Sequence, residues 1–389
     1  MTQTHIDRRR MLAGTAGAAA MALTGMPTLR AATQRPADSL ASAAEKAGCR
    51  FGSAFNALPR GIESASYLNP GYAALLERDC NILVAENELK WAAIRPDVDR
   101  YDFTRFDGMM AYAQAQGTAM RGHTLLWHKA KWFPKWLNTL DFGTRPASRA
   151  EDILVSHIRT VTARYAGQIV SYDVVNEAVV PETGALEKTV LSQAFGSEAG
   201  LLDRAFHAAR EHAPGIQLVY NDFMSWEPGQ EAHRAGVLKL LEGFKARGTP
   251  VDALGVQSHI EMYSLDPATG LGPHDEKGFR AFLDEVTGMG YDLVITEFDV
   301  KDNALPMDVA RRDRGVAAYA RAYLDLMLSY PQLKDVLCWG LNDKYSWLQG
   351  FSPREDKAPL RCCPYDGEGR PKLLRQTIID AFAARAART

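Results

Sequence analysis

The strongest constraint on the fold is a regular alternation of short apolar runs with amphipathic segments. From Cys49 onward no Gly-, Ser- or Pro-rich linker interrupts this alternation. The eight apolar runs cover residues 50–55, 81–86, 119–127, 169–176, 217–222, 254–259, 293–298 and 336–341. Between them lie segments with apolar residues at spacings of three and four, which are typical of amphipathic helices: 150–165, 201–212, 231–247, 278–289 and 309–328. The pattern predicts repeated βα units.

Eight such units in about 340 residues predict one closed (β/α)8 TIM barrel. A doubly wound sheet is the alternative, but the sequence has no GxGxxG turn to support it. Gly248 and Gly290 follow two helical segments and are expected to end them. Residues 373–387 read as a closing helix. We therefore expect a lead-in at 33–48 and a single domain at 49–389.

Residues 1–32 have the pattern of a twin-arginine type export signal. Arg8 and Arg9 precede a mildly apolar, Ala- and Gly-rich run to Leu23, and small residues surround Ala31. A basic arm followed by an Ala-rich helix is the alternative interpretation. The run is too short to span a bilayer, so no membrane anchor is expected. The signal predicts a periplasmic or extracellular protein.

The net charge of the chain indicates which kind of ligand it can bind. Without residues 1–32, the chain keeps 41 basic and 46 acidic side chains, a net charge of −5, which disfavours nucleic acid and suits a neutral substrate.

The five cysteines are Cys49, Cys80, Cys338, Cys362 and Cys363. Their odd number and the lack of CxxC or Cys/His spacing argue against a structural zinc site. Export permits a disulfide, but a twin-arginine substrate folds before it crosses, so reduced thiols are equally open.

Polar and aromatic side chains gather at the C-terminal ends of the apolar runs, where barrel enzymes carry their active sites. They are Glu86, Asn87, Lys90, His123, Trp127, His128, Asn176, Glu177, Asn221, Asp222, Gln257, His259, Glu297, Asp299 and Trp339, with Trp347 in the loop that follows. Glu177 and Glu297 each stand at the mouth of an apolar strand, about 120 residues apart. Two such carboxylates suggest an acid and a nucleophile.

This inventory favours a neutral polyhydroxylated ligand, because hydroxyls need paired donors and acceptors while sugar C–H surfaces need flat aromatic faces. Singly, the tryptophans could be barrel core, His259 a core histidine and Lys90 a surface charge. A metallohydrolase is another possibility, with His123, His128, His259, Asp222 and the Glu residues as ligands, although no HxH or HExxH pair occurs. A non-catalytic carbohydrate-binding barrel is a third, which the presence of both glutamates disfavours.

Six short motifs follow one another along the chain: AENELKW at 85–91, GHTLLWH at 122–128, DVVNEA at 173–178, VQSH at 256–259, ITEFD at 295–299 and WGLNDKYSW at 339–347. In this order they resemble glycoside hydrolase family 10, the endo-β-1,4-xylanases. The match covers nearly all of residues 49–385. The resemblance implies a (β/α)8 barrel with its acid/base after strand four, at Glu177, and its nucleophile after strand seven, at Glu297. It implies retaining hydrolysis of internal β-1,4-xylosidic bonds.

The resemblance also implies partners and further site residues. Xylan and xylo-oligosaccharides would be the substrates of a monomer that needs no cofactor; another β-glycanase, acting on cellulose or mixed-linkage glucan, is the alternative. Carried over residue by residue, the resemblance implies that Glu86, Asn87 and Lys90 bind sugar hydroxyls on the non-reducing side of the cleaved bond. The sugar at the cleaved bond would be held by His123 and Asn176, enclosed by Trp127, Trp339 and Trp347, and contacted at a hydroxyl near the acid/base by Gln257. His259 and Asp299 would orient Glu297. Mutual repulsion of the carboxylates is expected to raise the pKa of Glu177.

Two places depart from the family pattern. The family usually has Asn-Asp-Tyr after strand five, whereas this chain has Asn221-Asp222-Phe223. It often has Ser-Gln or Asn-Gln after the Trp-His pair, whereas Lys129-Ala130-Lys131 follows here. Both departures concern the leaving-group side, and neither touches Glu177 or Glu297.

Overall fold

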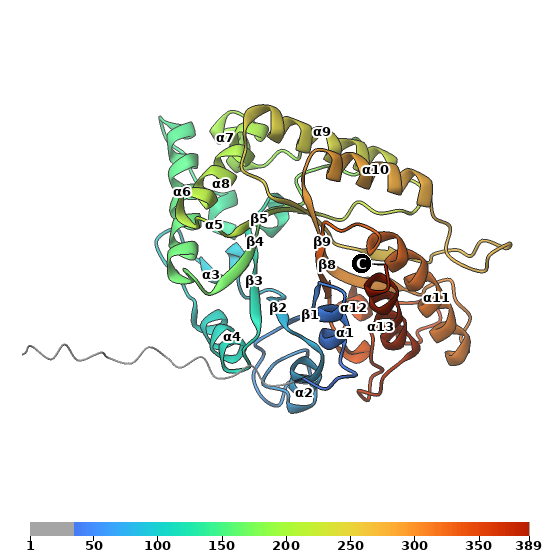
Figure 1. Ribbon diagram of the computed structural model, residues 1–389. Helices are drawn as coiled ribbons and strands as arrows, with labels where there is room; N and C mark the ends of the chain where they lie inside the picture. Colours follow the sequence, from blue (N-terminus) through green and yellow to red (C-terminus); the bar gives the residue numbers. More distant parts are fainter. Residues whose placement is uncertain (1–34, 389) are drawn as a thin grey trace, which may run out of the picture.

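The computed structural model describes residues 35–388 and shows a central barrel surrounded by helices (Figure 1). The export signal predicted at residues 1–32 lies outside the described residues. Helix α1 (Leu40–Lys46) lies within the lead-in predicted at residues 33–48. Across residues 35–388, no helix is long and apolar enough to cross a membrane.

Eight parallel strands form the barrel, and a ninth short strand extends it. The strands are β1 (Arg50–Phe55), β2 (Ile82–Ala85), β3 (Ala119–Trp127), β4 (Ile169–Asn176), β5 (Gln217–Asp222), β6 (Ala253–Val256), β7 (His259–Glu261), β8 (Asp292–Lys301) and β9 (Leu333–Cys338). Neighbours pair in chain order, β6 pairs with β8, and β1 pairs with both β2 and β9, which closes the barrel. Strand β7 pairs with β8 beyond the end of β6. The predicted (β/α)8 barrel is confirmed.

Two strands differ from the sequence prediction. The predicted strand at 254–259 is broken, because Ser258 has a φ of 63° and separates β6 from β7. Serine carries no signal for a left-handed conformation, so the sequence pattern runs through the break. The last strand begins and ends three residues before the predicted 336–341, and the chain turns just after it at Gly340, which has a φ of 114°.

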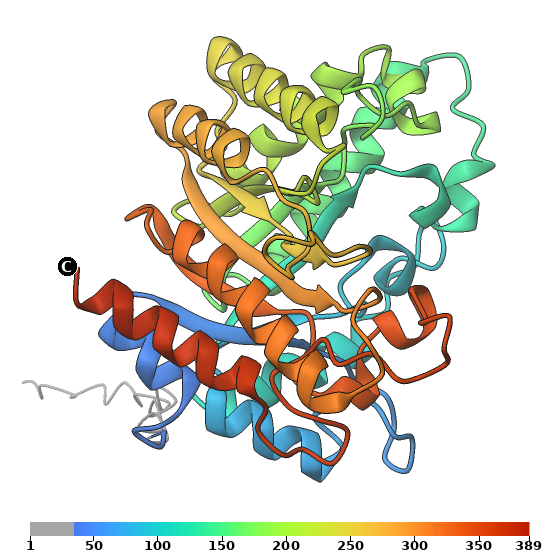
Figure 2. The ribbon, with the colours of Figure 1, turned by 90° about the vertical axis from the view of Figure 1, so that its right-hand side faces the viewer.

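The helices form a ring outside the barrel (Figures 1 and 2). Besides α1 they are α2 (Pro70–Asp79), α3 (Trp91–Ile94), α4 (Thr104–Ala115), α5 (Lys135–Asn138), α6 (Pro146–Arg164), α7 (Val190–Phe195), α8 (Glu198–His212), α9 (Glu231–Arg247), α10 (Glu276–Gly288), α11 (Val309–Met327), α12 (Leu348–Phe351) and α13 (Leu373–Ala386). All six predicted helical segments are present. Gly248 ends α9 with a φ of 70°, and Gly290 follows α10 with a φ of 84°, as expected for helix C-terminal glycines.

The core has three parts: one between barrel and helices, one inside the barrel, and a small cluster of Leu348, Leu360, Cys362 and Cys363. The inner cluster consists of Ala54, Ile82, Val84, Val219, Ala253, Val294, Leu337 and Trp339. Since strand side chains alternate between the two faces, every second residue of a strand points inward. Trp339 is 8% exposed and belongs to this cluster. Trp339 therefore packs in the inner core and also lines the mouth of the barrel.

A buried aspartate ties the first helices to the last one. Asp79, at the end of α2, accepts hydrogen bonds from the backbone N–H of Leu40 at 3.0 Å and from the guanidinium of Arg375 at 2.8 and 3.0 Å. Arg375 lies in α13, and Tyr365 also donates to Asp79. A carboxylate buried this deeply is tolerated because its oxygens are bonded to a charged partner and to further donors.

All five cysteines are buried and none is in a disulfide in the described chain. The Sγ atoms of Cys362 and Cys363 are 3.7 Å apart. The other three lie in the outer core with the aliphatic and aromatic side chains. Packing alone accounts for cysteines in such places, because a free thiol behaves as a small apolar group.

Candidate active site

Glu177 directly follows β4, and Glu297 lies within β8, so both stand at the C-terminal end of the barrel. In a regular strand, consecutive side chains point to opposite faces. Glu177 instead has a φ of 55°, a left-handed conformation that is rare outside glycine. The chain turns there, and the amide of Gln257 donates to the side chains of both Asn176, at 3.4 Å, and Glu177, at 3.0 Å. The two consecutive residues therefore share one site.

Three amide side chains connect the two carboxylates. Gln257 bridges Glu177 and Asn176, and the Nδ2 of Asn221 bridges Asn176 and Glu297 with two contacts of 2.8 Å. The Oδ1 of Asn221 accepts a hydrogen bond from Thr296 at 2.7 Å, which fixes the amide with its N–H groups toward Glu297. The sequence placed Asn221 at a strand end but assigned it no role, because a partner on another strand depends on the barrel register.

His259 lies between two carboxylates. Its Nδ1 is 2.9 Å from Asp299 and its Nε2 is 3.3 Å from Glu297, which is the arrangement that the sequence resemblance implied for these residues. Burial acts to lower the pKa of His259, but the negative charge of Asp299 and the hydrogen bonds to Asp299 and Glu297 raise it to about 9. The ring is protonated at neutral pH, so both nitrogens donate.

The two glutamates are shifted in opposite directions. Burial acts to raise the pKa of Glu297, but the hydrogen bond and charge of His259 outweigh it, with help from His123 and Lys90, and the pKa is lowered. The pKa of Glu177 is raised, chiefly by burial. The site therefore favours a proton on Glu177 and an anion at Glu297, which is the division of labour that an acid and a nucleophile require.

The cause of the Glu177 shift differs from our sequence-based expectation of mutual repulsion. After burial, the largest contribution that raises the pKa of Glu177 is the negative charge of Asp222, and that of Glu297 is smaller. Asp222 is buried and held by His233 at 3.1 Å and by the hydroxyl of Tyr220. The carboxylate of Asp222, more than that of Glu297, thus adds to the effect of burial on Glu177.

Aromatic rings and a lysine line the wall of the site next to these carboxylates. The Nζ of Lys90 lies 4.6 Å from the ring centroid of Trp127 and 5.9 Å from that of Trp339. The ring of His123 is 5.3 Å from Trp339 in an edge-on contact. Trp132, which is 43% exposed, stacks on Trp127 at 4.6 Å and was not anticipated from the sequence. Trp347 lies against His259, with ring centroids 5.0 Å apart.

The remaining predicted residues extend this wall. Lys90 donates to the Oδ1 of Asn87 at 2.9 Å, and Asn56 donates to Glu86 at 3.2 Å. His123 is fixed from behind, because its Nδ1 is 2.9 Å from the buried carboxylate of Asp173. Asp173 in turn pairs with Arg121, which is 0% exposed. The sequence gave no sign of this pair, because both side chains belong to strands that read as apolar.

Of the residues proposed for a metal alternative, His259 and Glu297 contact each other at 3.3 Å, whereas the other histidines and Asp222 have partners of their own. His123 contacts Asp173, His128 contacts the carbonyl of Glu187, His259 contacts Asp299, and Asp222 contacts His233. Over residues 35–388, the one group of acidic, histidine or cysteine side chains close enough to share an ion is Asp343, Cys362 and Cys363. Its aspartate is already paired with the buried Lys372 at 2.9 Å. The candidate ligands of the metallohydrolase reading therefore do not converge.

The two departures from the family pattern meet in space. The Nζ of Lys129 lies 6.0 Å from the ring centroid of Phe223 and 3.5 Å from Glu187. The backbone N–H of Glu187 bonds to the carbonyl of Ala178, the residue after Glu177. Both changes therefore lie beside the raised-pKa glutamate rather than beside Glu297.

Comparison with known proteins identifies the fold family. The sequence pattern described as glycosyl hydrolase family 10 matches residues 39–381. The chain belongs to this family. Among curated relatives, endo-1,4-beta-xylanase B of Thermotoga neapolitana is 28% identical over 301 residues, covering 77% of this chain and 80% of the relative.

Solved structures of this glycosyl hydrolase family superpose on the barrel. Native xylanase 10B from Thermotoga maritima has a TM-score of 0.77 at 27% identity and covers 90% of this chain and 100% of its own. Xylanase 10B from Thermotoga petrophila, solved with xylobiose, has the same TM-score and identity and covers 91% and 99%. The similarity to family members thus extends over most of each chain.

The position of His259 predicts a specific pH dependence of stability. A raised histidine pKa stabilises the folded state fully below the unfolded value of about 6.5, and this contribution is lost as the pH rises through about 9. Between pH 6.5 and 9.5 the free energy of unfolding of the wild type should fall by about 3 kcal/mol more than that of His259→Asn. Urea unfolding at several pH values measures this difference. His207→Asn, at an exposed position of α8, should follow the wild type; parallel curves for wild type and His259→Asn would contradict the assignment.

Proposed function

We propose that this family 10 member is an endo-β-1,4-xylanase that hydrolyses internal β-1,4-xylosidic bonds of xylan with retention of configuration. The observation that carries the proposal is the pair of glutamates at the barrel mouth, linked through amides and with pKa values shifted in opposite directions. Family membership and the xylanase relatives support the substrate class.

In the proposed reaction, Glu177 is the general acid and Glu297 the nucleophile. Glu177 donates its proton to the glycosidic oxygen as the bond breaks, and the carboxylate of Glu297 attacks the anomeric carbon to form a covalent glycosyl-enzyme. Glu177, now a carboxylate, takes a proton from water, which attacks the same carbon and releases Glu297. Two inversions give a product of retained β configuration. His259 and Asn221 stabilise the anionic form of Glu297 before it attacks and again as it is released.

The aromatic wall accounts for the choice of sugar. Trp127, Trp339 and Trp347 would stack on the xylose at the cut, while His123 and Asn176 hold its hydroxyls; Glu86, Asn87 and Lys90 bind the preceding unit on the non-reducing side. Aromatic stacking of this kind contributes on the order of 1 kcal/mol per ring beyond area burial. Gln257 serves both Glu177 and the nearby sugar hydroxyl. Xylose lacks the hydroxymethyl group of glucose, and Trp339 and Trp347 would crowd the space which that group needs.

Substrate preference is the first test. Because steric rejection of a single small group is worth about tenfold or more, initial rates of reducing-end release should be at least that much higher on xylan than on carboxymethyl-cellulose. Faster cleavage of carboxymethyl-cellulose would make the enzyme a glucanase of the same fold. Binding to xylan with no release of reducing ends would make the chain a carbohydrate-binding barrel instead.

The roles of the two glutamates can be separated by kinetics. Glu177→Ala should lower xylan cleavage by about 100- to 10,000-fold, because the proton donor is lost. An aryl xylobioside with an acidic phenol needs little protonation, so its first step should persist as a burst. Azide, which needs no base, should then speed turnover and give the β-azide. Product configuration by proton NMR and burst amplitude by stopped flow provide the measurements.

Glu297→Ala should behave differently, since no nucleophile remains. Even the activated substrate should show no burst, and azide rescue should give the α-azide. Glu242→Ala, at an exposed position of α9, is the matched control and should retain wild-type kinetics. A burst and β-azide from Glu297→Ala would exchange the two roles, and full activity of both active-site variants would refute the site.

We also propose that the enzyme acts as a monomer outside the cytoplasm after export by the twin-arginine route. Replacement of Arg8 and Arg9 by lysine should leave active enzyme in the cytoplasm, because that route reads the arginine pair. Activity in cytoplasmic, periplasmic and medium fractions measures the outcome. Arg30→Lys, in the same segment, is the control and should be exported normally. Unchanged export of the double variant would show that Arg8 and Arg9 are not part of the export signal.

A further inference from the structure

Trp347 makes a polar contact that a residue covering a sugar does not need. Its indole Nε1 donates a hydrogen bond of 2.8 Å to the Oδ2 of Asp299. Asp299 is 1% exposed, and its other oxygen, Oδ1, is bonded to His259. Within residues 35–388, the indole N–H is the one hydrogen-bond donor found for Oδ2. A buried carboxylate oxygen with a single donor depends strongly on that donor.

The contact completes a chain of hydrogen bonds that ends at Glu297. The indole donates to Asp299, the imidazolium of His259 donates to Asp299 at 2.9 Å, and the same ring donates to Glu297 at 3.3 Å. Each donor faces an anion, so every link is charge-assisted. The indole of Trp347 and the carboxylate of Glu297 are therefore joined through the side chains of Asp299 and His259.

We infer that Trp347 is a positioning residue for the nucleophile, acting through Asp299 and His259, in addition to any contact with the sugar. This inference rests on the proposed roles of Glu177 and Glu297. Without the indole N–H, the anion of Asp299 would lose a donor where water cannot replace it. Oδ2 would no longer be held in place, so the carboxylate could turn and misalign its hydrogen bond to the charged ring of His259, and Glu297 would become harder to ionise.

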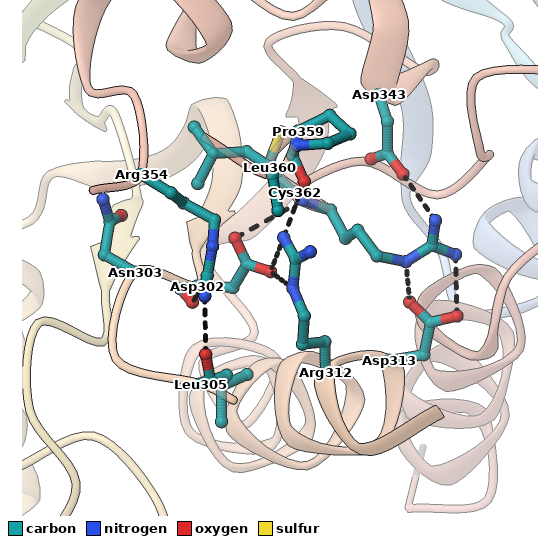
Figure 3. A network of polar contacts seen from close by, with 12 residues as sticks. Asp302, Asn303, Leu305, Arg312, Asp313, Asp343, Arg354, Pro359, Leu360 and Cys362 are labelled. Carbon is teal, nitrogen blue, oxygen red and sulfur yellow. Dashed lines mark hydrogen bonds and ion pairs between the residues drawn. The ribbon is translucent and has the colours of Figure 1, made fainter. Parts of the chain in front are cut away.

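The backbone around Trp347 is held firmly enough for such a role. Helix α12 begins just after Trp347, and the side chain of Gln349 exchanges two hydrogen bonds of 2.9 Å with the backbone of Leu360. Arg312 from α11 then binds the carbonyl of Pro359 at 2.7 Å, and Arg354 binds that of Leu305 at 2.8 Å (Figure 3). These arginines join the segment after β9 to the segment after β8.

Other charges face the same groups and will contribute to any pH profile. Lys90, His123 and Glu177 act on Glu297, and Lys301 of β8 lies near Asp299. Cys338 of β9 also faces Asp299, but burial raises the pKa of its thiol well above the usual value, so it is neutral. None of them contacts the indole nitrogen of Trp347 in the described structure. A substitution that removes only this nitrogen therefore changes one link and leaves these charges in place.

Trp347→Phe keeps an aromatic ring and removes the N–H. The acid limb of kcat/KM on an aryl xylobioside reports ionisation of the nucleophile in the free enzyme. In Trp347→Phe this limb should move to higher pH by about half a unit or more, because a hydrogen bond to the anionic chain is lost. Phe351→Leu is the matched control: it removes a ring that packs on Trp347 at 4.5 Å, and its acid limb should stay in place.

A double-variant cycle distinguishes transmission through Asp299 from loose packing. Asp299→Asn should raise the acid limb by itself, and adding Trp347→Phe to it should cause no further shift. Additive shifts would contradict the inference. So would a Trp347→Phe enzyme whose KM rises while its acid limb stays unchanged, since that is the behaviour of a sugar cover alone. If the acid limb of the remaining activity stayed at the same pH in a Glu297 variant, it would not report on Glu297, and the proposed roles of the two glutamates would be overturned.

A spectroscopic measurement stands even where a tryptophan variant folds poorly. The chain has seven tryptophans, so a ¹⁵N-labelled enzyme gives up to seven indole signals. Asp299→Asn should shift one of them and speed its hydrogen exchange, because the indole N–H of Trp347 loses its anionic acceptor. An indole spectrum identical to that of the wild type would show that the bond is not formed in solution.

Discussion

The active-site end of the barrel depends on shifting the pKa values of two carboxylates in opposite directions, that of Glu177 upward and that of Glu297 downward. Burial acts on both glutamates in the same direction, toward the neutral form. At Glu297 the hydrogen bond and charge of His259 overcome it, whereas at Glu177 the negative charge of Asp222 adds to it. The polar groups around the two glutamates are arranged so that their pKa values shift in opposite directions, although burial acts to raise both.

The barrel and its mouth could be predicted because both follow from local patterns. Apolar runs separated by amphipathic segments specify βα units, and parallel strands bring all their C-terminal ends to one edge. What the sequence could not supply was the set of partners across strands. The break at Ser258, the bridge made by Asn221 and the stacking of Trp132 on Trp127 depend on register and backbone conformation, and no local pattern encodes either.

Core and active site are not separate regions of this molecule. Trp339 packs with the inward-facing side chains of five other barrel strands and also lies 5.3 Å from His123 at the mouth. Arg121 and Asp173 are buried within the strands, and they hold that same histidine. Rigidity of the mouth is therefore inherited from the barrel, which agrees with the need to hold reacting groups within fractions of an ångström.

The buried carboxylate of Asp79 has a consequence for the order in which the molecule can be completed. Its guanidinium partner, Arg375, is 296 residues further along the chain, and β1 likewise waits for β9. A ribosome must release almost the whole polypeptide before either contact can form. During synthesis the chain therefore carries an open sheet edge and a carboxylate that still lacks the guanidinium of Arg375. Folding is completed only after the last helix has been made.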